Sequence, residues 1–138
     1  MVKLMIYSAN IIPVFPPKRP LTSAEMVQVD PDVARLEQVR EAIARRADRT
    51  KFLPANLFAD PAWDMLLDLY HSDLVQRRVT ISSLCIASNV PATTALRWIK
   101  ALEADGLASR EADPFDGRRY YIALTERGLT AMKEFFSL

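Results

Sequence analysis

The chain has 138 residues, half of them hydrophobic and a quarter charged, with a formal net charge of +1. This length suffices for one domain with a real hydrophobic core, and the near-neutral charge excludes a global basic field that would attract nucleic acid. A single cysteine excludes an internal disulfide, and a single histidine excludes a metal site built from several histidines.

Residues 1–30 are predicted to form an extended arm, because prolines at positions 13, 16, 17 and 20 prevent regular structure. Its apolar start lacks a small-residue cleavage site and is not interpreted as a secretion signal. With no apolar run of about 18 residues, the sequence predicts no membrane segment and a cytoplasmic protein. Three roles stay open for the arm: a loosely docked extension, an apolar arm crossing onto a partner subunit, or contact of Lys18 and Arg19 with DNA phosphates.

Residues 31–51 are predicted to form the first helix, with an apolar stripe at helical spacing and many arginines. The basic face is either solvated or bound to nucleic acid. Asp60 and Pro61 then suit the cap and the first position of a second helix, whose large apolar side chains predict a scaffold. At its end Arg77 and Arg78 either contact phosphate or offset the helix dipole.

Residues 80–124 predict a short helix, a tight turn, a longer helix and two strands. Thr80 can cap the short helix through its hydroxyl, and Asn89 tolerates the left-handed conformation of a sharp turn. The longer helix is expected over residues 91–104, with Gly106 free to terminate it. Its expected packing face consists of Ala95, Trp98, Ile99 and Leu102.

The other side of the helix 91–104 carries hydrogen-bonding and cationic groups, as a helix entering a major groove needs. The residues expected to contact DNA there are Thr93, Thr94, Arg97 and Lys100. Strands are predicted over residues 107–111 and 120–124, joined by a turn at 113–117. Arg118 and Arg119 lie where this loop re-enters the second strand, which suits phosphates or the minor groove.

The last helix is predicted over residues 125–138, capped by Thr125. Its apolar side is expected to pack on the first helix or on another subunit; it consists of Leu129, Met132, Phe135 and Phe136.

The sequence predicts neither an enzyme nor a bound cofactor. It contains no glycine-rich phosphate loop, no nucleophile elbow and no cluster of metal ligands. His71 is interpreted as a surface or boundary histidine. Cys85 occupies a position where helix packing favours a small buried side chain, and is therefore interpreted as structural.

Residues from near Asp60 onward resemble the MarR-type winged helix-turn-helix transcription regulators. Helix-turn-helix proteins are common, but an acidic-then-arginine wing followed by a Leu-Thr-x-x-Gly sequence is more specific. The motifs that carry the resemblance are Leu84-Cys85, Val90 to Thr94, Leu102-Glu103-x-x-Gly106-Leu107, Arg110, Asp116-Gly117-Arg118-Arg119 and Leu124-Thr125-Glu126-Arg127-Gly128.

The resemblance implies a mainly α fold with a small β-hairpin, in which helices at both ends flank a winged helix-turn-helix. The domain would span residues 31–138, with a DNA-binding core at 60–124 and a dimerisation helix at 31–51. The implied function is a homodimeric transcription regulator that binds double-stranded DNA. The helix 91–104 would enter the major groove, and the wing, residues 112–119, would lie on the adjacent backbone or minor groove.

Two further implications concern the wing and a ligand. By resemblance, Asp116 would pair with a wing arginine and hold the hairpin tip. Members of the family often bind small aromatic acids, and Phe58, Trp63 and Tyr70 either line such an effector pocket or belong to the core. The alternative function is a winged helix that binds another protein and does not read DNA.

Overall fold

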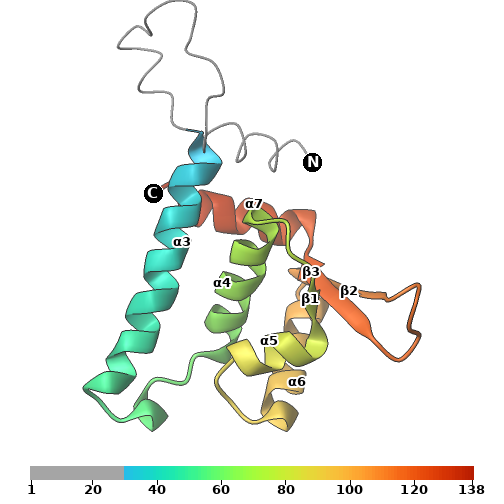
Figure 1. Cartoon of the computed structure of the whole chain (residues 1–138), viewed down its shortest axis with the longest axis horizontal. Helices are drawn as coiled ribbons and strands as arrows, with labels where there is room; N and C mark the ends of the chain where they lie inside the picture. The colour runs from blue at the N-terminus through green and yellow to red at the C-terminus, as the bar shows by residue number, and fades with distance from the viewer. Residues whose placement is uncertain (1–29) are drawn as a thin grey trace, which may run out of the picture.

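The computed structural model describes residues 30–138, which form five α-helices and one small antiparallel sheet (Figure 1). The helices are α3 (Pro31–Asp48), α4 (Pro61–Leu74), α5 (Ile81–Ala87), α6 (Ala92–Ala104) and α7 (Glu126–Phe135). The strands are β1 (Val79–Thr80), β2 (Ala108–Ala112) and β3 (Tyr120–Leu124), arranged in the order β1-β3-β2. Two short 3₁₀ helices, Arg49–Lys51 and Ala55–Leu57, connect α3 to α4.

This architecture confirms the predicted fold class, a winged helix-turn-helix flanked by helices at both ends. The sheet has one strand more than the predicted hairpin, because β1 pairs with β3 through Val79 and Ile122. The predicted arm, its secretion-signal interpretation and its possible roles fall on residues 1–29, which lie outside the described part of the chain. Within residues 30–138, no helix is long and apolar enough to cross a membrane.

Helix α4 lies at the centre of the domain and contacts α3, α5, α6, α7 and β3. Its buried apolar side chains point in several directions around the helix axis; they include Met65, Leu67, Leu69, Tyr70 and Leu74. A helix that is apolar around most of its circumference is stable only when other elements cover it. Helix α4 is therefore the scaffold that the sequence predicts.

Helices α3 and α7 cover α4 from two sides (Figure 1). Helix α3 buries Leu36 and Val39 fully. Ile43, further along the same apolar stripe, stays exposed because it lines a groove beside the α3–α4 connection. At the end of α7, the rings of Phe135 and of the following Phe136 pack on side chains of α4. The sequence predicts packing of these rings on the first helix or on another subunit, whereas the described ring contacts are with α4.

The helix-turn-helix forms through the predicted local devices. The Thr80 hydroxyl accepts the N–H of Ser83 at 3.2 Å, and Asn89 adopts the left-handed conformation with a φ of 57°. Gly106 terminates α6 with a φ of 71°, a value that a side chain would disfavour.

The expected packing of Trp98 is wrong, because its side chain is 41% exposed. Ala95, Ile99 and Leu102 form the fully buried stripe of α6. Trp98 lies about 60° around the helix from Ala95, at the edge of that stripe. The helical spacing predicts which side of α6 faces the core. How many residues on that side are buried depends on the elements that pack against the helix.

Gly128 is predicted to be essential for the contact between α7 and Leu107, the residue before β2. A Cβ at this position would overlap the carbonyl oxygen of Leu107. Helix propensity alone favours Gly128→Ala by at most about 1 kcal/mol, whereas overpacking typically costs about 1–3 kcal/mol. We therefore expect a net loss of unfolding free energy, measured by urea denaturation.

Gly117→Ala is the matched control, because a Cβ there would meet no atom within 4 Å. Its urea midpoint should stay close to that of the unmodified chain. A higher unfolding free energy for Gly128→Ala would show that propensity outweighs the close approach.

Candidate nucleic-acid interface

The outward face of α6 carries the polar and cationic side chains that the sequence predicts. Thr93, Arg97 and Lys100 are exposed, and Thr94 is half-buried. Neither Arg97 nor Lys100 forms an ion pair with any of the described residues. Two full positive charges are therefore available on one face of this helix.

The C-terminal end of α6 is fixed to β2 by a two-point contact between Glu103 and Arg110. The Arg110 Nε lies 2.6 Å from one carboxylate oxygen, and a terminal guanidinium nitrogen lies 3.0 Å from the other. The hydrogen bond to Glu103 raises the pKa of the Arg110 guanidinium. Two parallel bonds restrict orientation as well as distance, so this contact holds α6 and β2 in a defined arrangement.

The wing is closed from within by Asp113, which is buried. Its carboxylate accepts the backbone N–H of Phe115 at 2.8 Å and the Nε of Arg119 at 3.1 Å. These two bonds, first that of Phe115 and then that of Arg119, lower the pKa of Asp113. The Arg119 guanidinium also lies 5.8 Å from the ring centre of Tyr121. One of the two predicted wing arginines thus bonds within the hairpin, while 54% of its side chain stays exposed.

Arg118 differs from its neighbour, because its side chain is 95% exposed. Its Nε lies 3.5 Å from Asp116, which matches the pairing implied by the family resemblance. Such an exposed pair adds little stability. The closer pair is Asp113 with Arg119, which the sequence interpretation missed. An aspartate that binds the backbone N–H two residues later is a known turn signal.

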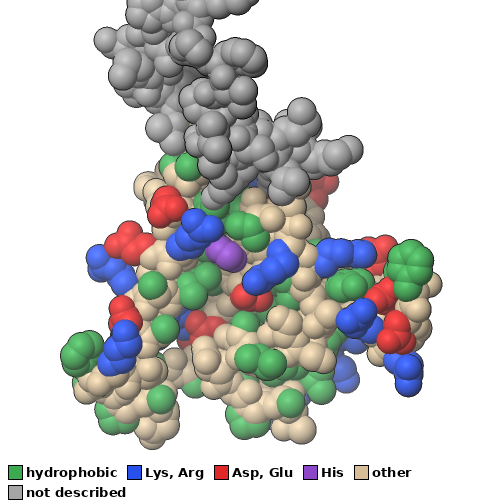
Figure 2. Space-filling model, in the orientation of Figure 1, with side chains coloured by type: hydrophobic (Ala, Val, Ile, Leu, Met, Phe, Trp, Pro, Cys, Tyr) green, Lys and Arg blue, Asp and Glu red, His purple; other side chains and the backbone are tan. Residues whose placement is uncertain are grey.

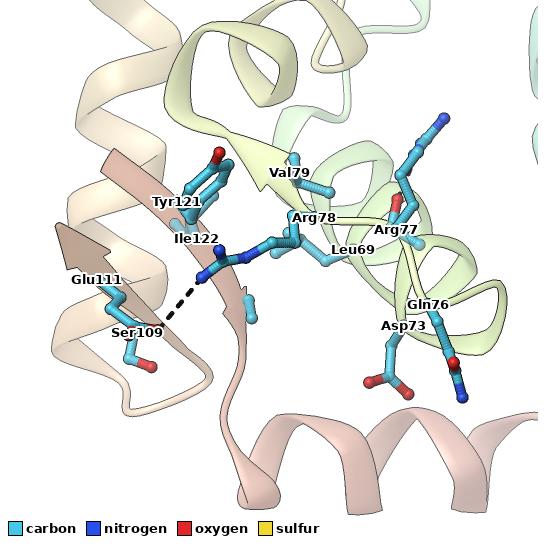
Figure 3. A pocket seen from close by; sticks show the side chains of 12 residues that line it. Leu69, Asp73, Gln76, Arg77, Arg78, Val79, Ser109, Glu111, Tyr121 and Ile122 are labelled. Carbon is cyan, nitrogen blue, oxygen red and sulfur yellow. Dashed lines mark hydrogen bonds and ion pairs between the residues drawn. The ribbon is translucent and has the colours of Figure 1, made fainter. Parts of the chain in front are cut away.

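Arg77 and Arg78, which follow α4, both have local partners. The Arg78 guanidinium lies 4.1 Å from the ring centre of Tyr121 and 3.9 Å from the carboxylate of Glu111. Figure 3 shows this side chain reaching toward β2 and β3, along a groove of about 510 Å³. Arg77 donates to the Ser72 hydroxyl at 2.8 Å. These contacts are with side chains of the sheet and of α4, and the two roles considered for these arginines, phosphate contact and compensation of the helix dipole, stay predictions.

These pairs explain how a nearly neutral region presents local positive charge. Residues 78–119 contain six cations and five anions. Four of each form the pairs described above, which leaves Arg97 and Lys100 against Asp105. Figure 2 accordingly shows basic and acidic side chains next to one another over the hairpin.

The three aromatic residues considered for an effector pocket do not meet in one cavity. Trp63 packs against Phe135 with ring centres 4.9 Å apart, and Tyr70 stacks on Phe136. Phe58 lines a separate groove of about 810 Å³ between α3, α4 and the α5–α6 turn. Binding of a small aromatic effector stays a prediction.

The two residues considered for enzyme chemistry are both half-buried. Burial raises the pKa of the Cys85 thiol and is the main cause of a lowered pKa for His71. Burial thus favours the neutral form of each group, whereas a reactive cysteine needs the thiolate.

Residues 65–128 match a family model described as a winged helix DNA-binding domain. This part of the chain is a winged helix domain. The matched residues run from α4 to the first turn of α7 and include the helix-turn-helix and the wing. None of the curated proteins matches the chain in sequence.

The winged helix domain is also similar to several solved structures. MepR of S. aureus in its DNA-binding conformation is 23% identical, with 73% of this chain and 71% of that chain covered and a TM-score of 0.51. The complex of MepR with DNA is 23% identical, with 73% and 78% covered and a TM-score of 0.50. AF1382 of Archaeoglobus fulgidus is 21% identical, with 65% and 90% covered and a TM-score of 0.49. At these identities the likeness to MepR shows the fold alone, and that fold is the winged helix which the resemblance implies.

We predict that Asp113 loses its proton at a pH below the ordinary aspartate value of about 3.9. The lowered pKa means that its bonds stabilise the wing above that pH, and that this stabilisation is lost as the pH falls through the pKa of the folded state. An NMR titration of the Asp113 carboxyl carbon measures this directly. Arg119→Ala should raise the pKa only partly, because the Phe115 bond remains.

Arg118→Ala provides the matched control, since Arg118 has no described bond to Asp113, whereas Arg119 has one. It should leave the Asp113 titration unchanged. An Asp113 pKa at or above the ordinary value would contradict the proposed closure of the wing.

Proposed function

We propose that the chain is a sequence-specific DNA-binding transcription regulator. Helix α6 enters the major groove, and the wing, residues 112–119, lies on the adjacent backbone or minor groove. The observation that carries the proposal is that Arg97 and Lys100 lie on the exposed face of α6 and form no ion pair with the described residues, while Glu103 and Arg110 fix the end of this helix to β2. The similar fold of MepR, which has been solved in complex with DNA, supports it.

Each proposed contact follows from the chemistry and position of its side chain. Thr93 and Thr94 lie in the first turn of α6, the part of a recognition helix that reaches base edges. Arg97 has the planar fork that binds guanine at two points. Lys100, one turn further on, is assigned to a phosphate.

The wing supplies the remaining proposed contacts. Arg118 is exposed and its weak pair with Asp116 is easily exchanged for a phosphate. Arg119 binds Asp113 through its Nε, so the rest of its guanidinium is assigned to DNA. The buried aspartate then orients this arginine.

We also propose that the protein acts as a cytoplasmic homodimer. A two-fold symmetric dimer would read a pseudo-palindrome with half-sites about one DNA turn apart. Apolar side chains for a subunit contact are available where the described chain ends, because Phe135 and Leu138 are exposed there. The first turns of α3 lie beside them, joined by a 3.1 Å hydrogen bond from Arg35 to Ser137.

The test is fluorescence anisotropy with DNA from upstream of the protein's own gene and with scrambled DNA, at several salt concentrations. Arg97→Ala should cost roughly 1–3 kcal/mol on the preferred DNA and relax specificity at one base. Lys100→Ala should weaken binding to both DNAs about equally and reduce the salt slope by about 1. Both effects follow from the different atoms that the two side chains contact.

Arg45→Ala is the control, because this exposed arginine of α3 pairs with Glu41 and lies outside the proposed interface. It should change neither affinity nor specificity. Unchanged binding of Arg97→Ala to both DNAs would reject the base-reading role. No binding of the unmodified chain near physiological salt would favour the alternative, a protein-interaction module.

A further inference from the structure

Phe115 lies in the loop at the outer end of the wing, and its side chain is 96% exposed. The ring buries almost no surface, so it contributes almost nothing to the hydrophobic stabilisation of the fold. A single exposed apolar residue is common on protein surfaces and decides nothing by itself. Its surroundings in the wing, however, indicate a contact.

The backbone that carries Phe115 is held in place, although no ring contact of Phe115 is found among residues 30–138. Its N–H is bound by the buried carboxylate of Asp113 at 2.8 Å. On the other side of the loop, the N–H groups of Arg118 and Arg119 bind Asp116 at 3.1 and 3.0 Å. The loop therefore presents the ring from a defined position.

Gly117 gives a second, independent observation at the same tip. Its φ lies outside the left-handed region, and an added Cβ would meet no atom within 4 Å. Neither backbone conformation nor space inside the fold requires glycine at this position. Because glycine has no side chain, another molecule can approach the backbone closely at this position.

The tip thus combines an apolar ring, a bare backbone and the exposed cation of Arg118 on one narrow hairpin end. The hairpin projects away from the helical body on the side opposite α3 (Figure 1). The minor groove of DNA is only about 6 Å wide. Its phosphates attract cations, and the deoxyriboses that form its walls offer apolar surface. A protein partner would instead be expected to contact a broader apolar patch.

We propose that Phe115 is a DNA-contacting residue, whose ring packs against the deoxyribose walls of the minor groove beside Arg118. Gly117 allows the backbone of the tip to approach the groove. This inference rests on the proposed DNA-binding function. It adds to that function a contact that does not depend on charge.

A contact that does not depend on charge has a specific effect on the salt dependence of DNA binding. Burying most of a phenylalanine ring corresponds to roughly a tenfold change in affinity. Phe115→Ala should therefore weaken binding about tenfold without changing the slope of log K against log salt, because no counterion release is lost. Arg118→Ala should instead reduce that slope by about 1. Phe115→Leu keeps an apolar contact and should retain most of the affinity.

The probe is a DNA duplex that the unmodified protein selects from a random pool. Hydroxyl-radical footprinting reports how accessible each deoxyribose is from the minor groove. The unmodified protein should protect deoxyriboses flanking each half-site, and Phe115→Ala should lose that protection while keeping the rest. Urea denaturation should give the same midpoint for both proteins, since the ring is exposed in the folded state.

Unchanged affinity and protection in Phe115→Ala would overturn the inference, as would a loss of affinity accompanied by a changed salt slope. If Arg97→Ala weakens binding but Phe115→Ala does not, only this inference fails. If no duplex is selected by the unmodified protein, the proposed function fails and the inference fails with it.

Discussion

The burial of α4 is the constraint on which the rest of the structure depends. Apolar side chains point from this helix in several directions, and each needs a covering element. Helices α3 and α7 cover it on some sides, while α5, α6 and β3 cover it on others. The outward face of α6 is therefore a consequence of packing. Once Ala95 and Ile99 are buried toward α4, Arg97 and Lys100 point away from it.

Charge pairing is the second organising feature, and it separates structural cations from available ones. The pairs Glu103–Arg110 and Asp113–Arg119 give the wing its shape and its attachment to α6. They also remove equal numbers of positive and negative charges from the long-range field. Within residues 78–119, the described pairs leave Arg97 and Lys100 on α6 against Asp105, so local placement of charge matters more than the net charge of +1.

Residues that the fold does not need give the clearest functional information. Arg97, Lys100 and the ring of Phe115 have few or no partners within the described part of the chain. Stability alone does not explain their presence. Sequence patterns predicted the cations, because a charged face on an amphipathic helix is visible in spacing. Phe115 was not predicted, since a loop gives no periodic signal and its exposure depends on how the hairpin closes.

The sequence by itself determined the helices, the caps at Thr80 and Thr125, the turn at Asn89 and the class of fold, because these depend on residues a few positions apart. Asp60 occupies the cap position of α4, but its side chain makes no capping hydrogen bond. It also determined which face of α6 is polar. Only the tertiary structure decided which charges are neutralised, since Asp113 meets Arg119 and Arg78 meets Glu111 through the pairing of strands and the closure of a loop. The same reason explains β1 and the exposure of Trp98. The pairing of β1 and the exposure of Trp98 depend on which elements pack against them, and the spacing of residues along the chain does not predict this packing.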